Sequence, residues 1–477
     1  MREKLSSKIK ILESYHTIRS DLIKRFVETV EKLDKWELFR INPFVFAEKY
    51  GFSEQEAVEL FIYSARSGIF DFSWNFICPH CGAILTAESS LNSFQIKNNR
   101  CYLCKVNIPV ELDDYVEVSF TINPDIKKLV LRSETRREDF FKYYFSANFI
   151  RSQDFREYSA EVFRRFDIVL SEKSKTLSFE AEKGKIYRLY LINLNAIIYF
   201  ETDQEENKRK QTIELIVDQK MIQEQHLAIH SGKVSIQIFN HMNESIGMTF
   251  LNTDENEMNQ VVMANKSHLK KFLTGKMLLN NQIFRNIFKI QNLDSNLRLK
   301  VRSLTLLFTD LKDSTALYDK IGDMAAYKLI QEHFKILTEI VKKNSGAVIK
   351  TMGDAVMASF SEPFDGIKAA VDMIQTLKLS DGDGKIRLGL KIGLHEGHAL
   401  AIHANEKLDY FGQTVNIAAR LQGLSDTNQI WISDSIMQDS KVETFLQENQ
   451  YSLEKHQVAL KGIGSEVKAY KCYIKQL

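Results

Sequence analysis

Four of the five cysteines place the strongest constraint on the fold of this chain. They form two Cys-x2-Cys pairs, Cys78 with Cys81 and Cys101 with Cys104, with 19 residues between the pairs. Each pair can lie on a tight turn that points both thiolates at one ion, so the spacing predicts a structural zinc site with no open position for catalysis. Disulfide pairing is the alternative, although disulfides are unusual in cytosolic chains. The fifth cysteine, Cys472, is predicted to be a small buried apolar side chain.

Length and charge bound the remaining possibilities. A chain of 477 residues is long enough for about three domains. Its 64 Lys+Arg nearly balance 62 Asp+Glu, so the net charge of +2 provides no global attraction for DNA, RNA or an anionic membrane. The longest apolar run, Ala196 to Phe200, is too short to span a bilayer, and Lys8 and Lys10 interrupt the region where a secretory signal would be apolar. We therefore expect a cytoplasmic protein with no transmembrane segment and no DNA partner.

The N-terminal sequence predicts helices. From Met1 to about Lys35 the apolar residues recur at helical spacing, which indicates an amphipathic helix. Gly51 is expected to end a second helix, and Ser53 with Glu56 forms a capping box that opens a third. Two helices at a tight turn also suggest a helix-turn-helix, but acidic residues at the start of the second helix would face DNA phosphates badly. A structural helical pair is the favoured interpretation.

Between Thr176 and Leu251 the apolar residues alternate with a period of two, which predicts a small antiparallel β domain folded as a sandwich. The segments Glu182–Lys185 and His230–Lys233 supply its turns. Helical patterning returns near Lys266 and runs to about Phe288, and a polar connector follows.

Two aspartates near the C-terminal strands suggest metal chemistry. Asp310 is predicted to end an apolar strand, at Leu304–Asp310, that turns into a helix. Asp354 lies at the bend between two apolar strands, within residues 347–360. If these strands are neighbours, both carboxylates lie at one edge, where two divalent cations could bind for phosphoryl transfer. Taken alone, each aspartate could equally be a turn or cap residue.

A third segment identifies the chemistry. Asp409, Asn416 and Arg420 lie within DYFGQTVNIAARL, and the last two residues share one face of a predicted helix. Together with FTDLKDST, KTMGDA and GLHEG, in this order, the segment makes the region Val301–Tyr473 resemble the class III nucleotidyl cyclase catalytic domain. The resemblance implies a ferredoxin-like α/β core and a homodimer with its active sites at the subunit interface.

The resemblance also implies roles for individual residues. Asp310 and Asp354 would bind two Mg²⁺ or Mn²⁺ ions, and the backbone carbonyl of Leu311 would join one of them. Asn416 and Arg420 would orient the ribose and stabilise the transition state, a role suited to a guanidinium.

Lys350 and Asp409 occupy the purine-selecting positions. Lys350 only donates hydrogen bonds and the Asp409 carboxylate only accepts them, which matches N1 and N6 of adenine and mispairs with guanine. This pair therefore predicts ATP as the substrate, and the resemblance implies its conversion to 3′,5′-cyclic AMP and pyrophosphate. Lys461 is the candidate triphosphate contact, although Ile463 stands where the family often has a second basic residue.

The N-terminal half looks like a soluble module that precedes some bacterial cyclase domains, and CPHCG and VEVSFTINP carry that looser resemblance. We expect a multidomain α+β chain in which this half responds to an unknown signal or protein partner. Its predicted parts are a helical region (1–75), a zinc ribbon (76–110), a β-rich domain (111–260), a helical linker (261–300) and the cyclase domain (301–477). The alternatives are a guanylate cyclase, a non-catalytic nucleotide-sensing regulator, and a zinc-ribbon protein that binds nucleic acid.

Overall fold

The computed structural model describes residues 2–15, 17–89, 100–108, 115–131, 137–204, 210–252, 260–261, 264, 268–288, 299–312, 319, 321–379, 389–404, 407–427 and 429–474. The chain divides into an N-terminal unit that ends at Leu273 and a C-terminal unit that begins at Thr274. Each unit is described by itself. Among the helices of the described residues, none has the length and apolar character needed to cross a membrane.

The N-terminal unit begins with four helices: α1 (Arg2–Glu13), α2 (Ser20–Lys32), α3 (Pro43–Tyr50) and α4 (Glu54–Ser67). The first predicted helix is therefore two helices. The expected stripe of α2 is buried, with Phe26 fully enclosed. The capping box is confirmed, because Ser53 accepts from the Glu56 backbone and Glu56 accepts from the Ser53 backbone. Gly51 ends α3 in the left-handed conformation with φ of 71°.

A three-stranded antiparallel sheet follows, in the order β2 (Ile84–Glu88), β1 (Phe70–Ile77) and β5 (Val116–Ile122). Its strands come from both sides of the predicted boundaries at residues 75 and 110. The other elements of this region are α5 (Arg137–Tyr144), α6 (Gln153–Val162), and the short strands β3 (Arg100–Cys101), β4 (Val106–Asn107), β6 (Phe149–Ile150) and β15 (His268–Leu269).

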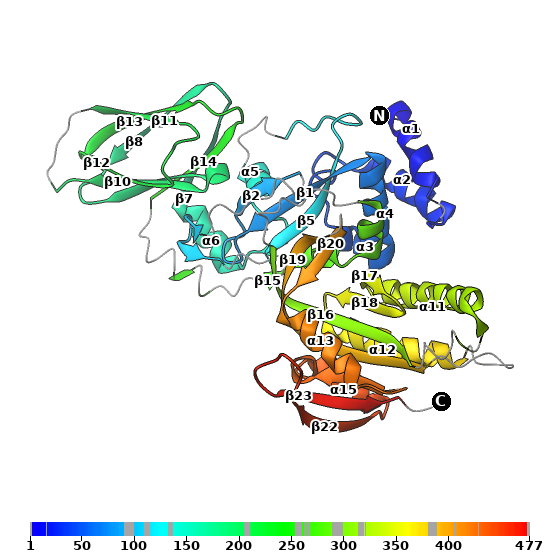
Figure 1. Cartoon of the computed structure of the whole chain (residues 1–477). Coiled ribbons are helices and arrows are strands. Elements are labelled where there is room, and N and C mark those ends of the chain that lie inside the picture. Colours follow the sequence, from blue (N-terminus) through cyan, green and yellow to red (C-terminus); the bar gives the residue numbers. More distant parts are fainter. Residues whose placement is uncertain are drawn as a thin grey trace. The chain divides into compact units, whose positions relative to one another are not determined.

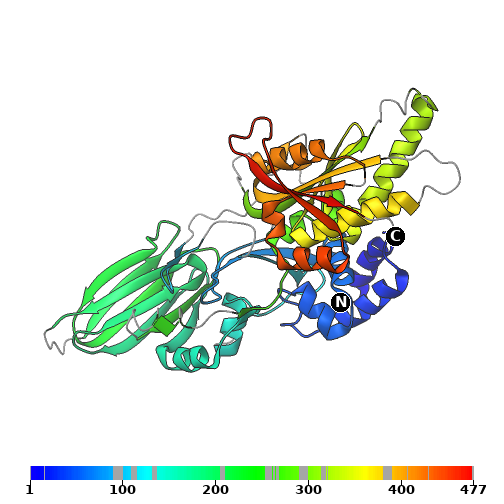
Figure 2. The ribbon, with the colours of Figure 1, turned by 90° about the horizontal axis from the view of Figure 1, so that it is seen from below.

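The predicted β-rich region folds as two sheets packed around a shared apolar core, drawn in green in Figures 1 and 2. One sheet has the order β12-β10-β9-β14-β7 and the other β11-β13-β8. The purely antiparallel prediction is incomplete, because β12 pairs parallel with β10 and β11 pairs parallel with β13. The strands are β7 (Phe163–Val169), β8 (Ser174–Ala181), β9 (Ile186–Leu191), β10 (Ala196–Thr202), β11 (Gln211–Val217), β12 (Glu224–Ile229), β13 (Gly232–Asn240) and β14 (Ile246–Leu251), with a 3-10 turn η1 (Ile192–Leu194).

Parallel pairing arises because the predicted turns do not close hairpins. Glu182–Lys185 joins β8 to β9, and His230–Lys233 joins β12 to β13, so each turn carries the chain from one sheet to the other. Adjacent strands of one sheet are then often separated in sequence, which allows either direction of pairing.

The C-terminal unit is built on one eight-stranded sheet, shown in Figure 1. Its first four strands follow a β-α-β-β-α-β path in the spatial order β17-β18-β16-β19, all antiparallel, which is the expected ferredoxin-like core. Strand β20 pairs with β19, and β21, β23 and β22 extend the sheet. The strands are β16 (Leu299–Lys312), β17 (Ala347–Met352), β18 (Ala355–Phe360), β19 (Gly389–Ala404), β20 (Lys407–Phe411), β21 (Gln429–Ser433), β22 (Ser452–Val458) and β23 (Val467–Tyr473).

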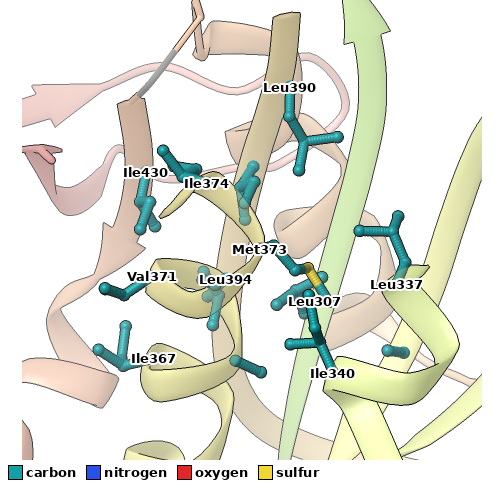
Figure 3. Close-up of a cluster of buried hydrophobic side chains, with 14 of the residues drawn as sticks. Leu307, Leu337, Ile340, Ile367, Val371, Met373, Ile374, Leu390, Leu394 and Ile430 are labelled. Carbon is teal, nitrogen blue, oxygen red and sulfur yellow. The ribbon is translucent and has the colours of Figure 1, made fainter. Parts of the chain in front are cut away.

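Helices cover both faces of this sheet. The main apolar cluster lies between the sheet and the helices α11 (Asp323–Lys343), α12 (Pro363–Leu379), α14 (Asp434–Met437) and α15 (Ser440–Glu448), and Figure 3 shows Leu307, Ile340 and Ile374 within it. Helix α13 (Gln413–Leu424) packs on the opposite face, since Leu421 contacts Trp431 whereas Ile430 and Ile432 join the main cluster. Cys472 is fully buried in the main cluster, as predicted.

Two short helices begin this unit, α8 (Gly275–Leu279) and α9 (Gln282–Ile287). The continuous helix predicted from about residue 266 is wrong, because Thr274 caps α8 through the Met277 N–H and Asn281 caps α9 through the Phe284 N–H. Before them, His268–Leu269 pairs as a strand with β6. Residues 265–267 and the predicted polar connector at 291–298 lie outside the described residues.

Gly393 determines how closely α13 approaches β19. A Cβ atom at this position would lie 2.1 Å from the backbone nitrogen of Gln422 and 2.6 Å from its Cα. Because these are backbone atoms of a packed helix, no side-chain rotation relieves the clash.

We therefore expect Gly393→Ala to destabilise the C-terminal unit by about 1–3 kcal/mol or more, measured by urea unfolding. Gly423→Ala is the matched control. Gly423 lies on α13 beside Gln422, and a Cβ atom at this position would have no neighbouring atom within 4 Å. That substitution should leave the unfolding free energy unchanged or raise it by about 0.5–1 kcal/mol. Equal effects of the two substitutions would contradict the packing argument.

Candidate functional site

Asp310 and Asp354 lie close together in the C-terminal unit. Thr309 pairs with Val356, which places the next residue of β16 beside the turn that precedes β18. The prediction that the strand ends at Asp310 is wrong. The strand continues to Lys312, because its pairing with β19 extends that far. The predicted helix start at residues 313–315 lies outside the described residues.

The electrostatics of the two carboxyl groups would suit a bound cation. The pKa of Asp310 is raised, first by burial and then by the negative charge of Asp354. Oδ2 of Asp354 is buried and, within the part of the chain that the structure describes, has no hydrogen-bond partner. A buried carboxylate oxygen without a donor is costly, and a divalent cation between the two carboxylates would relieve both effects. The donor set therefore fits Mg²⁺ or Mn²⁺. Leu311 is buried in the apolar core, so only its backbone carbonyl can contribute.

Lys391 is a site residue that the sequence analysis missed. It lies on β19 directly opposite Asp310, and its positive charge lowers the pKa of that carboxyl against the two raising effects. An ammonium group beside paired carboxylates is well placed for a polyanionic ligand. Its position just before the GLHEG strand motif was the available signal, but only the strand register shows which residue it faces.

His333 is a second residue that was missed. It is 2% exposed on the inner face of α11, and burial lowers its pKa to about 4 while the charge of Asp354 acts in the opposite direction. Neither ring nitrogen has a hydrogen-bond partner among the described residues. The ring is therefore a neutral group near the carboxylate pair, and its helical spacing alone made it indistinguishable from an apolar core residue.

Lys350 and Asp409 are brought together. Nζ of Lys350 donates to Oδ2 of Asp409 at 2.6 Å, and Oδ1 of Asp409 accepts from the Tyr410 backbone at 2.8 Å. The lysine side chain is 39% exposed and the aspartate side chain 18% exposed. A partly exposed ion pair of this kind contributes roughly 0–1 kcal/mol to folding stability. A ligand that bonds to both side chains can therefore replace the bond between them at little cost.

The structure does not bring the other three predicted site residues, Asn416, Arg420 and Lys461, into contact with Asp310, Asp354, Lys350 or Asp409 among the described residues. Asn416 and Arg420 are exposed on α13, and their side chains make no hydrogen bond or ion pair within the described part of the chain. They share one face of the helix, because Thr414, Ala418 and Leu421 turn the opposite face toward the sheet. Lys461 is exposed in the loop between β22 and β23.

The four cysteines of the N-terminal unit form one compact cluster. All are buried and free of disulfides, and their sulfur atoms lie within 4.8 Å of one another. The Cys78 and Cys104 sulfurs are 3.5 Å apart, and those of Cys81 and Cys101 are 3.7 Å apart. A tetrahedral zinc ion with bonds of about 2.3 Å requires sulfur spacings of about 3.8 Å, so the cluster fits zinc.

The backbone around the cluster is shaped for these thiols. The Gly82 N–H donates to the Cys78 carbonyl at 2.9 Å, and Gly82 has a φ of 74°. A Cβ at Gly82 would lie 2.6 Å from the Phe149 ring, so this position needs glycine for space as well as for conformation. Burial raises the pKa of the Cys101 thiol well above its usual value, and a bound cation would supply the charge that a thiolate needs there.

Family models match almost the whole chain. Residues 4–286 match a family of unknown function (DUF5939), and residues 299–474 match the adenylate and guanylate cyclase catalytic domain. An uncharacterized protein of Mycobacterium tuberculosis is 34% identical over 26% of this chain and 30% of its own length. An adenylate cyclase of Anabaena cylindrica is 24% identical over 40% of this chain and 41% of its own length. The chain thus spans less than half the length of these relatives.

Solved structures align with the same region. Adenylate cyclases from Trypanosoma brucei in their monomeric state share 18% identity, covering 38% of this chain and 94% of theirs, with a TM-score of 0.32. The adenylyl cyclase CyaB from P. aeruginosa shares 22% identity over 37% of this chain and 96% of its own, also at a TM-score of 0.32. The guanylate cyclase domain of RhGC from Catenaria anguillulae shares 19% identity over 37% and 99%, again at 0.32.

The cysteine geometry predicts about one zinc ion per purified chain by elemental analysis. Cys81→Ser should lose the zinc and lower the melting temperature of the N-terminal unit, because thiolate ligation contributes to folding. Cys472→Ser, at a buried cysteine outside the cluster, is the control and should keep the zinc. If wild type is purified without zinc, and Cys81→Ser melts at the same temperature as wild type, the cluster does not bind a structural metal ion.

Burial of His395 on β19 predicts a pH dependence of stability. Burial lowers its pKa from the ordinary histidine value of 6.5 to about 4. The unfolded chain then binds the proton more readily than the folded chain, so stability is complete above about pH 6.5 and falls as the pH drops toward 4. At pH 5 the loss is about 2 kcal/mol.

Urea unfolding at pH 7.5 and pH 5 tests this dependence. His395→Gln, which cannot titrate, should lose less stability between the two pH values than wild type, whereas all other groups contribute equally to both proteins. Identical losses in wild type and variant would show that His395 does not carry the effect.

Proposed function

Because this chain belongs to the family of unknown function DUF5939 and carries an adenylate and guanylate cyclase catalytic domain, we propose that it is an adenylate cyclase. It converts ATP to 3′,5′-cyclic AMP and pyrophosphate. The ribose 3′-oxygen forms a bond to the α-phosphorus as its O–H bond breaks and the proton passes to solvent, and the bond from that phosphorus to the bridging oxygen of the pyrophosphate breaks. The observation that carries the proposal is the pairing of Lys350 with Asp409.

This pair supports adenine as the base. In the structure the ammonium donates to the carboxylate, so each group already faces a partner of the opposite hydrogen-bonding character. Adenine offers an acceptor at N1 and a donor at N6, and can therefore satisfy both groups when it separates them. Guanine presents a donor and an acceptor in reversed positions and would leave both groups mispaired, at a cost on the order of 1–3 kcal/mol each. GTP is the alternative substrate.

Asp310 and Asp354 would hold two Mg²⁺ or Mn²⁺ ions, with the Leu311 carbonyl joining one. When bound, such ions neutralise the triphosphate and lower the pKa of the attacking hydroxyl. Lys391, beside Asp310, would bind a phosphate oxygen and share that neutralisation. Lys461 is the second triphosphate contact that we propose.

Asn416 and Arg420 would position the ribose and stabilise charge on the transferring phosphoryl group. Their exposure on α13 supports a site completed by a second copy of the chain, so we propose a homodimer with two equivalent active sites. The N-terminal unit, with a structural zinc ion at its cysteine cluster, would regulate this dimer in response to a signal or protein partner. Free thiols at that cluster support a reducing, cytoplasmic location.

The test incubates the full chain with ATP or GTP and with Mg²⁺ or Mn²⁺, and identifies the products by mass spectrometry. We expect cyclic AMP from ATP, at least ~10-fold more than cyclic GMP from GTP at equal concentrations. Asp354→Ala should reduce turnover by more than ~100-fold, because it removes a metal ligand. Asp365→Ala, at an acidic residue in the first turn of α12, is the control and should retain activity.

Faster cyclisation of GTP would establish the guanylate alternative. No cyclic product with either nucleotide, alongside nucleotide binding by equilibrium dialysis, would favour the non-catalytic nucleotide-sensing regulator.

A further inference from the structure

The segment made of α8 and α9, residues 275–287, precedes the sheet of the C-terminal unit and is hydrogen-bonded to the strands that carry Lys350 and Asp409. These residues lie on β17 and β20, which are not neighbours: β18, β16 and β19 stand between them in the sheet. Backbone pairing therefore does not fix the distance between the two side chains directly. Besides the direct bond between the two side chains, contacts from outside the sheet can then hold the two strands at the spacing that recognition requires.

Helix α9 contacts β17 at an irregular point of the strand. The register of β17 shifts between Val348 and Lys350, which marks a bulge at this edge of the sheet. The Val348 N–H donates to Oε1 of Gln282 at 2.6 Å. Because a bulge directs the side chains that follow it, this bond stabilises the backbone from which Lys350 extends.

The same helix also contacts β20. The Arg285 guanidinium donates to the carbonyl of Leu408, the residue before Asp409, and to the carbonyl of Leu279 at 3.2 Å. It also lies over the Tyr410 ring, 6.0 Å from the centroid. Arg285 therefore contacts both neighbours of Asp409 in sequence: the backbone carbonyl of Leu408 and the side-chain ring of Tyr410.

Asn280 adds a third connection from the turn between α8 and α9. Its Oδ1 accepts from Oγ of Ser359 on β18 at 2.6 Å and from the Tyr410 hydroxyl on β20 at 2.9 Å. The side chain is completely buried, where such bonds lose the least to water. One short segment thus contacts the two sheet regions that carry the purine-selecting residues.

We propose that Gln282 and Arg285 are positioning residues for base selection, which hold Lys350 and Asp409 at the spacing that accepts adenine. This inference rests on the proposed function, since it assigns the pair to the purine. The segment is also part of the region matched by the family of unknown function, which ends at residue 286. Residues from that family's region therefore support the specificity pair of the cyclase domain.

The experiment compares Arg285→Met and Gln282→Met with wild type in the full chain. Each substitution keeps the approximate length of the side chain but removes its bond to β20 or β17. We expect the ratio of kcat/KM for ATP to that for GTP to fall by about 10-fold in each variant, because mispositioned groups discriminate less. Arg285→Lys, which keeps a donor, should recover part of the ratio.

Asn344→Ala is the matched control for loss of a buried side-chain bond. Asn344 donates to the Ile340 carbonyl at 3.0 Å and to Asp372 at 3.1 Å, which joins α11 to α12 and not the purine-selecting strands. It should lower stability while leaving the ATP to GTP ratio unchanged. If Arg285→Met and Gln282→Met also lower activity without changing that ratio, their role is structural and the inference is wrong.

Amide hydrogen exchange separates this inference from the proposed function. In wild type, residues 348–350 and 408–410 should exchange slowly, and Arg285→Met should accelerate exchange at 408–410 by more than ~10-fold. If wild type forms no cyclic nucleotide, the proposed function fails, and the ratio of ATP to GTP dissociation constants replaces the kinetic ratio. Unchanged exchange or an unchanged binding ratio in Arg285→Met then overturns the inference.

Discussion

The pairing of β16 with β18 on one side and with β19 on the other is the interaction on which the candidate site depends. It sets Asp310 beside the turn that carries Asp354 and opposite Lys391. The register is fixed by apolar side chains, since Leu307 and Leu311 both enter the main cluster. A slip of one residue would exchange the two faces of β16 and expose that core. The polar site is therefore positioned by hydrophobic burial, which outweighs the cost of crowding two carboxylates.

The closeness of Asp310 and Asp354 changes how readily Asp310 loses its proton. Burial and the neighbouring carboxylate both raise the pKa of Asp310, while the charge of Lys391 and a hydrogen bond from the Leu311 backbone act in the opposite direction. The fold holds the two carboxylates side by side although their negative charges repel each other. A cation-binding site of this kind gains affinity from relief of repulsion, and protons compete with the cation for the same oxygens.

The sequence predicted features that depend on local chemistry. The Ser53 and Glu56 capping box, the clustering of the cysteines and the burial of Cys472 all follow from residue types at fixed spacing. Features that depend on tertiary packing were less accessible. The period of two identified β8, β11 and β13, which form one sheet with a single buried face, whereas β14 of the other sheet is buried at every position and shows no alternation.

The same distinction explains the residues that were missed. Lys391 gains its significance only from the partner that faces it across the sheet, and His333 only from burial near Asp354. The linker was predicted as one helix because its apolar residues keep helical spacing through Thr274 and Asn281. Both residues also cap helices, and local capping bonds prevailed over the apolar period.

The linker is bonded within both units, on either side of the boundary at Leu273. In the N-terminal unit the Leu273 carbonyl accepts from the Val118 N–H on β5 at 2.7 Å, and the Lys271 carbonyl accepts from Asn42 at 2.8 Å. Within the C-terminal unit, bonding to the sheet begins at Asn280. Only residues 274–279 separate the two sets of bonds along the chain. The first groups after this boundary that bond to the sheet belong to Asn280, Gln282 and Arg285, and they contact the strands around Lys350 and Asp409.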